Sequence, residues 1–400
     1  MGFLGRFISK QAPILPSSGG FGRSGGLFGG NARNITPDNA MQLTTVFTCN
    51  RVLAETISSI SLNLFEKIEN GKQIASFHTL HNLLKYEPNP FITSVTWREM
   101  IVTDLNLRGD HFSQIVRNGL GEVLGIYPLD AKKMEVLMVG GKKVFRYTIG
   151  STQKVDLSSF EILHIMGIPA GDGLRGLSPI SANKRALELG STAEAYGSKF
   201  FDNGANASGA FSIPGTLPEE SFNRLKNSLE SAYAGVVNSH KPMLLEEGMK
   251  FERFTISNND SQFLETRKYQ KEEIASIFRV PMHMVNSLEN ATYSNIEHQS
   301  LDFVQFSILP WLKRIEQSLT LSLLSVDERE HYAIKFNVDS LLRGDFDTRT
   351  KGYATLFNIG AISQNEIRAK ENMNSIGEEG DKYYVQLNMG ETSTIKDGEK

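Results

Sequence analysis

Cysteine is nearly absent from this chain. Cys49 is the single cysteine among 400 residues, which excludes an internal disulfide and a multi-cysteine zinc site and fits a reducing cytosol. Cys49 lies in the apolar-rich run TTVFTCNRVLAETI, so we expect a buried and inert thiol.

The chain also lacks long apolar runs. None reaches the ~18 residues that a membrane span needs. The start, MGFLGRFISK, has no long apolar region with a small-residue cleavage site, and Arg6 stands where a myristoylation pattern has serine or threonine. These features predict no export signal and no membrane anchor.

No excess of basic charge is present either. The net charge of −3 argues against a protein that grips DNA phosphates along a basic face, but it permits one that surrounds DNA without tight binding. With 40% hydrophobic and 22% charged residues, the composition is typical of a soluble globular protein. A length of 400 residues predicts two or three structural units.

Motifs for metal binding and covalent catalysis are missing. The sequence has neither H-E-x-x-H nor G-x-S-x-G, and no carboxylate or cysteine cluster accompanies His78 and His81, of which His81 is expected to start a helix. Glu265, Glu272 and Glu273 lie among basic residues at helical spacing, which is typical of a solvated or intersubunit helix face. We therefore predict no catalytic residue, no cofactor and no metal.

One motif does suggest an enzyme. GDGLRG, Gly171–Gly176, matches G-x-G-x-x-G between a predicted strand and a predicted helix, which is the setting of a dinucleotide-binding loop. However, the glycines end before Ser178 and Pro179 open the helix, and no acidic strand end follows some 20 residues later. A turn without a ligand is the competing interpretation, and a nucleotide-binding enzyme that uses this motif is the alternative function.

Periodicity predicts an α+β fold. Residues 1–40 are rich in glycine and serine and predict a flexible arm. Residues 41–177 predict a helix with an apolar stripe, a hairpin turning at Asn70-Gly71, and a helix from a Thr96/Glu99 capping box to Gly109. Five short strands follow, HFSQIVRN, VLGIYPL, KMEVLMV, VFRYTI and EILHIMGI.

The middle of the chain predicts two helices separated by an insert. The helix 178–204 has Ser178 as N-cap and Pro179 at its first position and is expected to run unbroken to Asn203-Gly204. The insert 205–260 predicts a strand, a helix that begins with the Thr216/Glu219 capping box, and two further strands. The segment 261–284 predicts the second helix, which should end at Pro281 because proline disfavours helix at Val280.

A polar loop and a long helix come next. The loop, 285–295, has no lysine or arginine. The helix opens with a Ser294/Glu297 capping box, carries one apolar stripe over ~30 residues, and should kink at Pro310, which has no N–H for an intrahelical bond. Residues 296–344 comprise this helix and the strand YAIKFNV, and residues 345–400 predict two more helices, with Asp345 and Asp347 at a helix start, and a polar tail.

Six stretches together resemble one known family, the portal (head-to-tail connector) proteins of tailed bacteriophages, in the siphovirus-type branch. They are PNPFITSVTWREMIVTDLNLRGDHF, HIMGIPAGDGLRGLSPI, KFFDNGANASGAFSIPG, LETRKYQKEEIASIFRVP, TYSNIEHQSLDFVQFSILPWLKRIEQSL and GDFDTRTKGYATLFNIGAISQNEIR, in the family's order. The chain departs from the family pattern where Asp110, His111 and Phe112 replace Asn-Ala-Tyr, and where Arg279 replaces a glycine.

The resemblance implies a portal fold and a ring, usually of twelve identical subunits. It assigns residues 41–177 to the wing, 178–204 and 261–284 to a two-helix stem, and 205–260 to a small α/β clip. Residues 296–344 are then the long kinked helix and a return to the wing, and 345–400 are the crown segment and tail.

The resemblance also gives the polar loop a role. It makes 285–295 the tunnel loop that projects into a channel for double-stranded DNA, where a ring of added lysines would retard the duplex. The residues implied are Ser287, Leu288, Glu289, Asn290, Ala291, Thr292, Tyr293 and Asn295. The implied partners are further copies of the chain, DNA, the terminase large subunit, the major capsid protein and the head-tail adaptor, with the protein in the virion and, during assembly, in the host cytoplasm.

Overall fold

The structure, a computed structural model, describes residues 13, 34–69, 71–202, 209–212, 215, 218–233, 250–253, 259–285, 293–338, 346–371 and 373–384. The chain divides into two compact units, Met1–Phe336 and Asn337–Lys400. Most of the predicted arm, most of the polar loop and much of the insert lie outside the described residues. No described helix is both long enough and apolar enough to span a bilayer.

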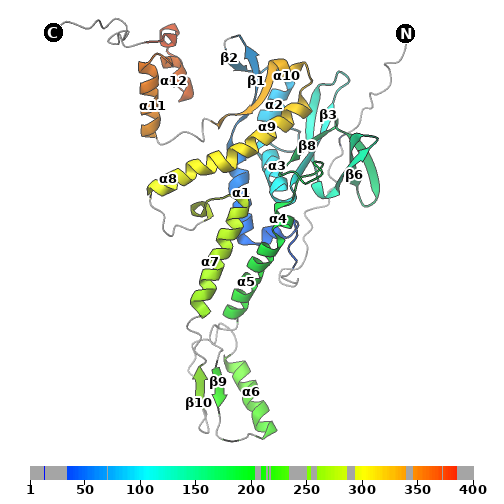
Figure 1. Ribbon diagram of the computed structural model, residues 1–400, viewed down its shortest axis with the longest axis vertical. Helices are drawn as coiled ribbons and strands as arrows, with labels where there is room; N and C mark the ends of the chain where they lie inside the picture. Colours follow the sequence, from blue (N-terminus) through cyan, green and yellow to red (C-terminus); the bar gives the residue numbers. More distant parts are fainter. Residues whose placement is uncertain are drawn as a thin grey trace, which may run out of the picture. The chain divides into compact units, whose positions relative to one another are not determined.

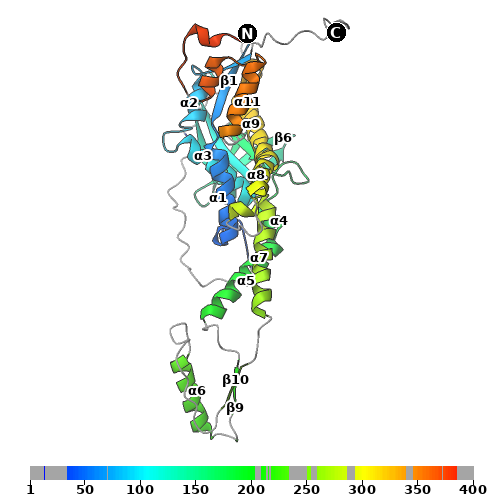
Figure 2. The same ribbon diagram turned by 90° about the vertical axis from the view of Figure 1, so that its left-hand side faces the viewer.

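Two helices form the centre of the first unit. α1 (Thr44–Ser59) packs beside α3 (Ser94–Arg108), as Figure 2 shows. The predicted apolar stripe of α1 is buried, and the expectation of a buried Cys49 is confirmed. Asn106 Nδ2 donates to Asn50 Oδ1 at 3.0 Å, so a polar contact fixes the register of the two helices.

In the part of the chain that the structure describes, antiparallel strands form four small sheets, whose orders are β11-β1-β2, β4-β3-β8, β5-β6-β7 and β10-β9. Figure 1 shows where they lie in the chain. The strands are β1 (Leu62–Ile68), β2 (Gly71–Ile74), β3 (Asp110–Arg117), β4 (Val123–Leu129), β5 (Met134–Val139), β6 (Lys142–Ile149), β7 (Gln153–Ser158), β8 (Ile162–Met166), β9 (Gly209–Ser212), β10 (Lys250–Arg253) and β11 (Tyr332–Phe336). The predicted hairpin and the five predicted strands are confirmed. β7 was not predicted, because its sequence QKVDLS buries only Leu157 and gives little apolar signal.

A shared core joins β3 to the β5-β6-β7 sheet. Phe112 of β3 lies against Phe145 of β6, with ring centroids 6.0 Å apart, and Met134, Tyr147, Leu157 and Ile162 are buried around them. These large side chains bury most of their surface, so the two sheets are held together by apolar packing.

The first of the two predicted middle helices is broken. Ser178 is the N-cap of α4 (Pro179–Ala182) and its side chain accepts from Ser181 N, as predicted. The helix then stops at Asn183, and α5 (Lys184–Asp202) follows. Asn183 N and Asn183 Nδ2 both donate to the Pro179 carbonyl, at 3.1 and 2.9 Å, and the non-helical φ of −111° and ψ of 25° at Asn183 interrupt the helix.

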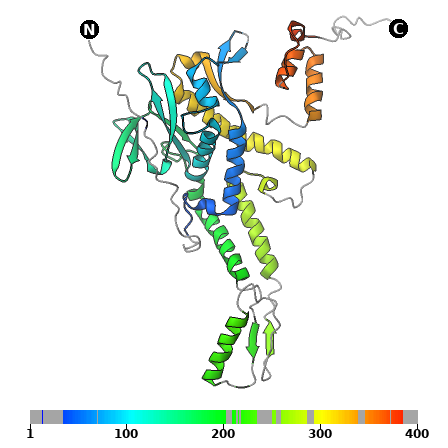
Figure 3. The ribbon, with the colours of Figure 1, turned by 180° about the vertical axis from the view of Figure 1, so that it is seen from behind.

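The second middle helix, α7 (Asn259–Phe278), lies beside α5 (Figure 3). It ends two residues earlier than predicted, at Arg279, whose φ of 54° is left-handed. A single 3-10 turn, Met282–Val285, follows. Of the insert, the structure describes β9, β10 and α6 (Glu219–Tyr233). The third predicted strand lies outside the described residues.

The long helix is continuous but not regular. α8 (Tyr293–Asp302) leads into a π-helical segment, Phe303–Ile308, and then into α9 (Leu309–Leu323). A π-segment lies just before Pro310, where Leu309 N bonds Val304 O. The kink predicted at Pro310 stays a prediction. The predicted apolar stripe is buried along α9, including Leu312, Ile315, Leu319 and Leu323.

The predicted helix starts were less accurate. The N-cap of α3 is Thr93, which accepts from Thr96 N, so the Thr96/Glu99 capping box was wrong. Ser294 lies inside α8, so it is not an N-cap. α2 (Thr79–Lys85) begins at His78, whose side chain accepts from Leu80 N, and not at His81. The caps of α3 and α2 each lie three residues before the predicted position, because neighbouring Thr and His residues compete locally.

The second unit contains α11 (Phe346–Asn358) and α12 (Gln364–Lys370). Arg349 makes a two-bond contact with Glu371, at 2.7 and 3.0 Å, that joins the two helices. Ser363 and Glu366 form a complete capping box. The two helices predicted for 345–400 are confirmed.

The first unit also contains the short helix α10 (Glu328–His331), which precedes β11.

Candidate functional site

Three backbone segments meet where α4 leaves the sheets. Gly109 ends α3 with a φ of 84°, Gly167 follows β8, and Gly176 precedes α4. A Cβ on Gly176 would lie 1.9 Å from the Gly109 carbonyl oxygen, and a Cβ on Gly109 would lie 2.5 Å from the backbone of Leu177. Only glycine permits this approach, so the direction in which α4 departs is fixed by the backbone itself.

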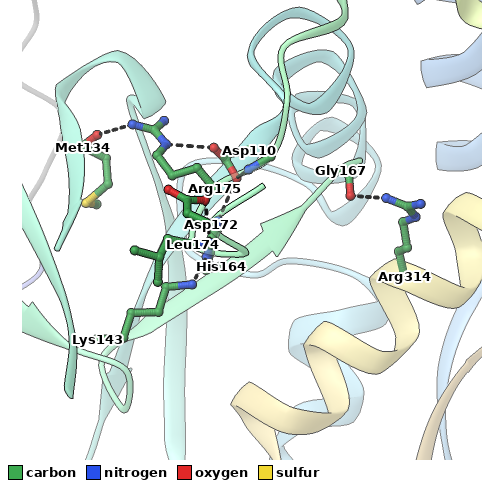
Figure 4. Close-up of polar contacts among 10 residues, drawn as sticks. Asp110, Met134, Lys143, His164, Gly167, Asp172, Leu174, Arg175 and Arg314 are labelled. Carbon is green, nitrogen blue, oxygen red and sulfur yellow. Dashed lines mark hydrogen bonds and ion pairs between the residues drawn. The ribbon is translucent and has the colours of Figure 1, made fainter. Parts of the chain in front are cut away.

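A buried carboxylate accepts hydrogen bonds at the place where these segments meet (Figure 4). Asp110, the residue after Gly109, is fully buried. Its Oδ1 accepts from Gly176 N at 2.7 Å and from His164 Nε2 at 2.9 Å, and its Oδ2 accepts from Arg175 Nε at 2.9 Å. Burial alone would raise the pKa of Asp110, but these three donors lower it, so the carboxyl stays ionised.

His164 is a neutral bridge between two charges. Lys143 Nζ, which can only donate, lies 3.0 Å from His164 Nδ1, so the imidazole proton resides on Nε2 and points to Asp110. The ring also stacks on Phe112, with centroids 4.5 Å apart. Burial lowers the pKa of His164, and the Lys143 charge lowers it further, against the opposing effect of Asp110.

This cluster, which we call the Asp110 junction, connects five elements. Asp110 lies on β3, His164 on β8, Lys143 on β6 and Arg175 in the turn before α4. Arg175 Nη1 also donates to the Met134 carbonyl on β5 at 3.1 Å. Arg314 of α9 donates to the carbonyl of Gly167 (Figure 4). The two sheets, the long helix and the start of α4 are therefore fixed relative to one another.

The Asp110 junction excludes a phosphate from GDGLRG. In a nucleotide-binding loop the backbone N–H groups face the phosphates. Here Gly176 N donates to Asp110, Leu174 N donates to Asp172 Oδ1 at 3.0 Å, and Gly173 N donates to the Ala170 carbonyl. These three N–H groups are paired within the protein, two of them with carboxylates, so the geometry argues against binding of a dinucleotide by this motif.

A second buried network has the order of a catalytic triad. His111 Nε2 lies 2.8 Å from Ser113 Oγ, and His111 Nδ1 lies 2.7 Å from Asp104 Oδ2. However, Ser113 and His111 are fully buried, and Trp97 Nε1 donates to the same hydroxyl at 3.2 Å. No substrate can approach the serine, so the network joins α3 to β3 and performs no nucleophilic chemistry. Among the described residues, no group of three or more metal-ligating side chains occurs.

The helices α5 and α7 make a close, partly polar contact. A Cβ on Gly190 of α5 would lie 3.2 Å from Ile274 of α7, so the helices approach closely at this point. Beside it, Glu194 of α5 faces Arg267 and Lys271 of α7. Burial raises the pKa of Glu194 while these two cations oppose the rise. Part of the charged face predicted for α7 therefore contacts α5 of the same chain.

The ends of the polar loop are held by the π-segment. Pro310 cannot bond the Phe306 carbonyl, and Arg279 Nη1 approaches that oxygen at 3.4 Å. Ser307 Oγ donates to the Arg279 carbonyl at 2.7 Å, and His283 Nδ1 lies 2.9 Å from Gln299 Oε1. Both ends of the loop are thereby attached to each other. Of the predicted loop residues, 287–292 lie outside the described residues, and Tyr293 and Asn295 are in the first turn of α8.

Comparison with known proteins identifies the family. The family model described as phage portal protein matches residues 44–372. The probable portal protein of Streptomyces phage phiC31 is 33% identical over 378 residues, which cover 92% of this chain and 82% of the relative. The chain belongs to the phage portal protein family. The portal protein of Enterobacteria phage HK97 is 30% identical over 345 residues, with 85% and 81% covered.

A solved structure shows the same fold. A chain in the neck of a native gene transfer agent (GTA) particle computed with C12 symmetry has a TM-score of 0.59 and 24% identity, covering 85% of this chain and 94% of that chain. The resemblance stated from sequence and the α+β portal fold are confirmed.

The sequence interpretation missed the Asp110 junction. His164 and Arg175 both lie more than 50 positions after Asp110, so no local motif joins them to it. The available signal was the acidic residue that stands at Asp110 where the family pattern has Asn. A carboxylate on a buried strand needs a buried partner. The glycine expected at Arg279 is explained by its left-handed φ.

We predict that Gly176→Ala destabilises the fold while Gly171→Ala does not. The added Cβ at 176 collides with the Gly109 carbonyl, which should lower the free energy of unfolding by about 1–3 kcal/mol. A Cβ at 171 meets nothing within 4 Å. Urea denaturation of both variants measures the difference. Equal stability of the two variants would contradict the close approach.

We also predict acid sensitivity from His164. Because the pKa of His164 is lowered in the folded state, the unfolded state takes up the proton first as the pH falls below ~6.5. The contribution of His164 to the free energy of unfolding is fully present above that pH. Below it, the free energy of unfolding should fall by up to about 1.4 kcal/mol per pH unit. His164→Gln, which can still donate and accept, should flatten this slope in urea titrations. His331→Gln, at the exposed end of α10, should leave it unchanged, and an equal effect of both variants would contradict the assignment.

Proposed function

We propose that twelve copies of this chain form a closed ring at one capsid vertex. The ring is the channel for packaging and ejecting double-stranded DNA. Membership of the portal family over residues 44–372 carries the proposal. The similarity in fold to a chain in a neck computed with C12 symmetry supports a ring of twelve. The chain acts by geometry and makes or breaks no bond.

The parts of the chain then take distinct roles. Residues 41–177 form the wing, α4, α5 and α7 form the stem within 178–204 and 261–284, and 205–260 form the clip. Residues 296–344 and 345–400 supply the long helix and the crown. The contact of α5 with α7 supports the stem, because paired helices give a stiff wall. The clip would face the terminase large subunit and later the head-tail adaptor, and the wing would contact the major capsid protein.

The tunnel loop would comprise Ser287, Leu288, Glu289, Asn290, Ala291, Thr292, Tyr293 and Asn295. Two observations support this assignment. The contacts of Arg279 with Phe306 and Ser307 attach the segment before the loop to the π-segment, and His283 contacts Gln299 after the loop, so the loop leaves from a fixed base. No lysine or arginine lies between Val280 and Gln299, which suits a surface that DNA passes without arrest.

The ring makes a prediction about mass and shape. Purified protein should form particles of about 530 kDa, twelve times the 44.5 kDa of the chain, with an axial hole. Light scattering measures the mass and negative-stain microscopy shows the hole. Monomers or dimers under conditions that permit assembly would contradict the ring.

Added positive charge tests the tunnel loop. Ser287→Lys with Asn290→Lys should raise the DNA affinity of the ring, and each phosphate newly neutralised should steepen the slope of log affinity against log salt by about 0.9. The control, Ser151→Lys with Thr152→Lys, adds the same charge at the exposed turn after β6. Salt-dependent binding that is equal in both variants would place the loop outside the channel.

A further inference from the structure

An open groove in the first unit collects exposed apolar side chains. It has a volume of about 930 Å³ and lies between the turn after β2, the β3–β4 turn, Phe160 and the segment joining α9 to α10. Five of its lining residues are among the most exposed large apolar residues described, namely Phe77 (104% exposed), Leu120 (88%), Val326 (72%), Leu321 (65%) and Phe160 (62%). Such a cluster indicates a surface that another segment covers.

The walls of the groove are fixed by two arginines. Arg117 of β3 donates to the Gly121 carbonyl at 3.0 Å and to the Ser322 carbonyl at 2.6 Å, and its guanidinium lies 4.4 Å from the Phe160 ring centroid. Arg329 donates to the carbonyls of Leu324 and Leu321 at the end of α9. Both cations therefore face backbone oxygens, and the groove is preformed.

Carboxylates outnumber the arginines at the groove. Glu66, Glu122 and Glu328 line it together with Arg117 and Arg329, and the charge of Arg117 acts on Glu328. The groove therefore keeps an excess of negative charge. A ligand with apolar side chains and positive charge would satisfy both the exposed carbons and these acids.

The chain itself contains a segment of that chemistry. Residues 1–33 have four basic side chains, Arg6, Lys10, Arg23 and Arg33, and no acidic one, the first acid being Asp38. The apolar residues Phe3, Leu4, Phe7 and Ile8 fall among the first two of these charges. We propose that residues 3–10 of a neighbouring copy occupy the groove, with the apolar side chains against Phe77, Phe160 and Val326 and the basic ones toward the carboxylates.

The length of the arm permits an occupant from a neighbour. Asp38 pairs with Arg108, the last residue of α3, so the arm leaves near the end of α3. The groove lies beside α2, which packs at the beginning of α3. The 23 residues from 11 to 33 span at most roughly 80 Å. This inference rests on the proposed ring, in which each arm finds one groove.

Disulfide trapping tests the contact. Phe7→Cys chains and Val326→Cys chains are mixed under assembly conditions and oxidised. Cys49 does not interfere, because it is buried and burial raises the pKa of its thiol to about 12. We expect a species of twice 44.5 kDa on a non-reducing gel. The control pair of Phe7→Cys with Ser151→Cys should give none, since Ser151 lies in a turn outside the groove.

Charge reversal refines the test. Arg6→Glu with Lys10→Glu should reduce the yield of the trapped pair several-fold, whereas Arg23→Glu with Arg33→Glu changes the same charge elsewhere on the arm and should not. A second double-cysteine chain, Phe7→Cys with Val326→Cys, is diluted into excess wild-type chain. Loss of its thiols without a change in mass would overturn the assignment to a neighbour.

The mass of the unoxidised particles separates the two proposals. Rings that form without trapping would overturn the arm contact and leave the ring intact. Trapped pairs in the absence of rings would support the arm contact and contradict the ring. Neither rings nor trapped pairs would contradict both.

Discussion

The structure depends on one buried carboxylate placed beside three glycines. Asp110 accepts from Gly176, His164 and Arg175, and it can do so only because Gly109 and Gly176 let two backbones touch. A charge with no solvent is costly unless every lone pair is satisfied, so these groups are mutually required. Loss of the carboxylate, of one of its donors or of one of the glycines would leave the direction of α4 and the packing of the two sheets undefined.

A second local constraint, around Pro310, fixes the base of the polar loop. Pro310 leaves a carbonyl without its usual donor, and the π-segment and Arg279 accommodate it. An arginine with left-handed φ is strained, and its contacts with Phe306 and Ser307 offset that strain. The consequence is a fixed base for the polar loop, supplied by two helices that are separated along the chain by the loop itself.

Local rules in the sequence predicted much of the fold. The apolar stripes of α1 and α9, the hairpin at Gly71, Ser178 as an N-cap and Gly109 as a helix stop all depend on neighbouring residues, and all were predicted correctly. Contacts between distant residues could not be predicted. The Asp110 junction depends on distant partners, such as His164 for Asp110, that periodicity does not reveal. The break at Asn183 and the π-segment before Pro310 arise within one or two turns, but the apolar pattern runs through both without a change.

The family assignment gives these contacts a purpose. A ring that passes DNA needs stiff walls, a fixed direction for the helices that leave the sheets, and a loop surface without positive charge, and the chain offers a physical basis for each. Cryo-electron microscopy of the purified assembly tests the central claim most directly. The expected map is a closed ring whose axial channel is lined by residues 287–295, with the Asp110 junction intact in every copy. A compact particle without an axial channel, or a ring with that loop on its outer surface, would contradict it.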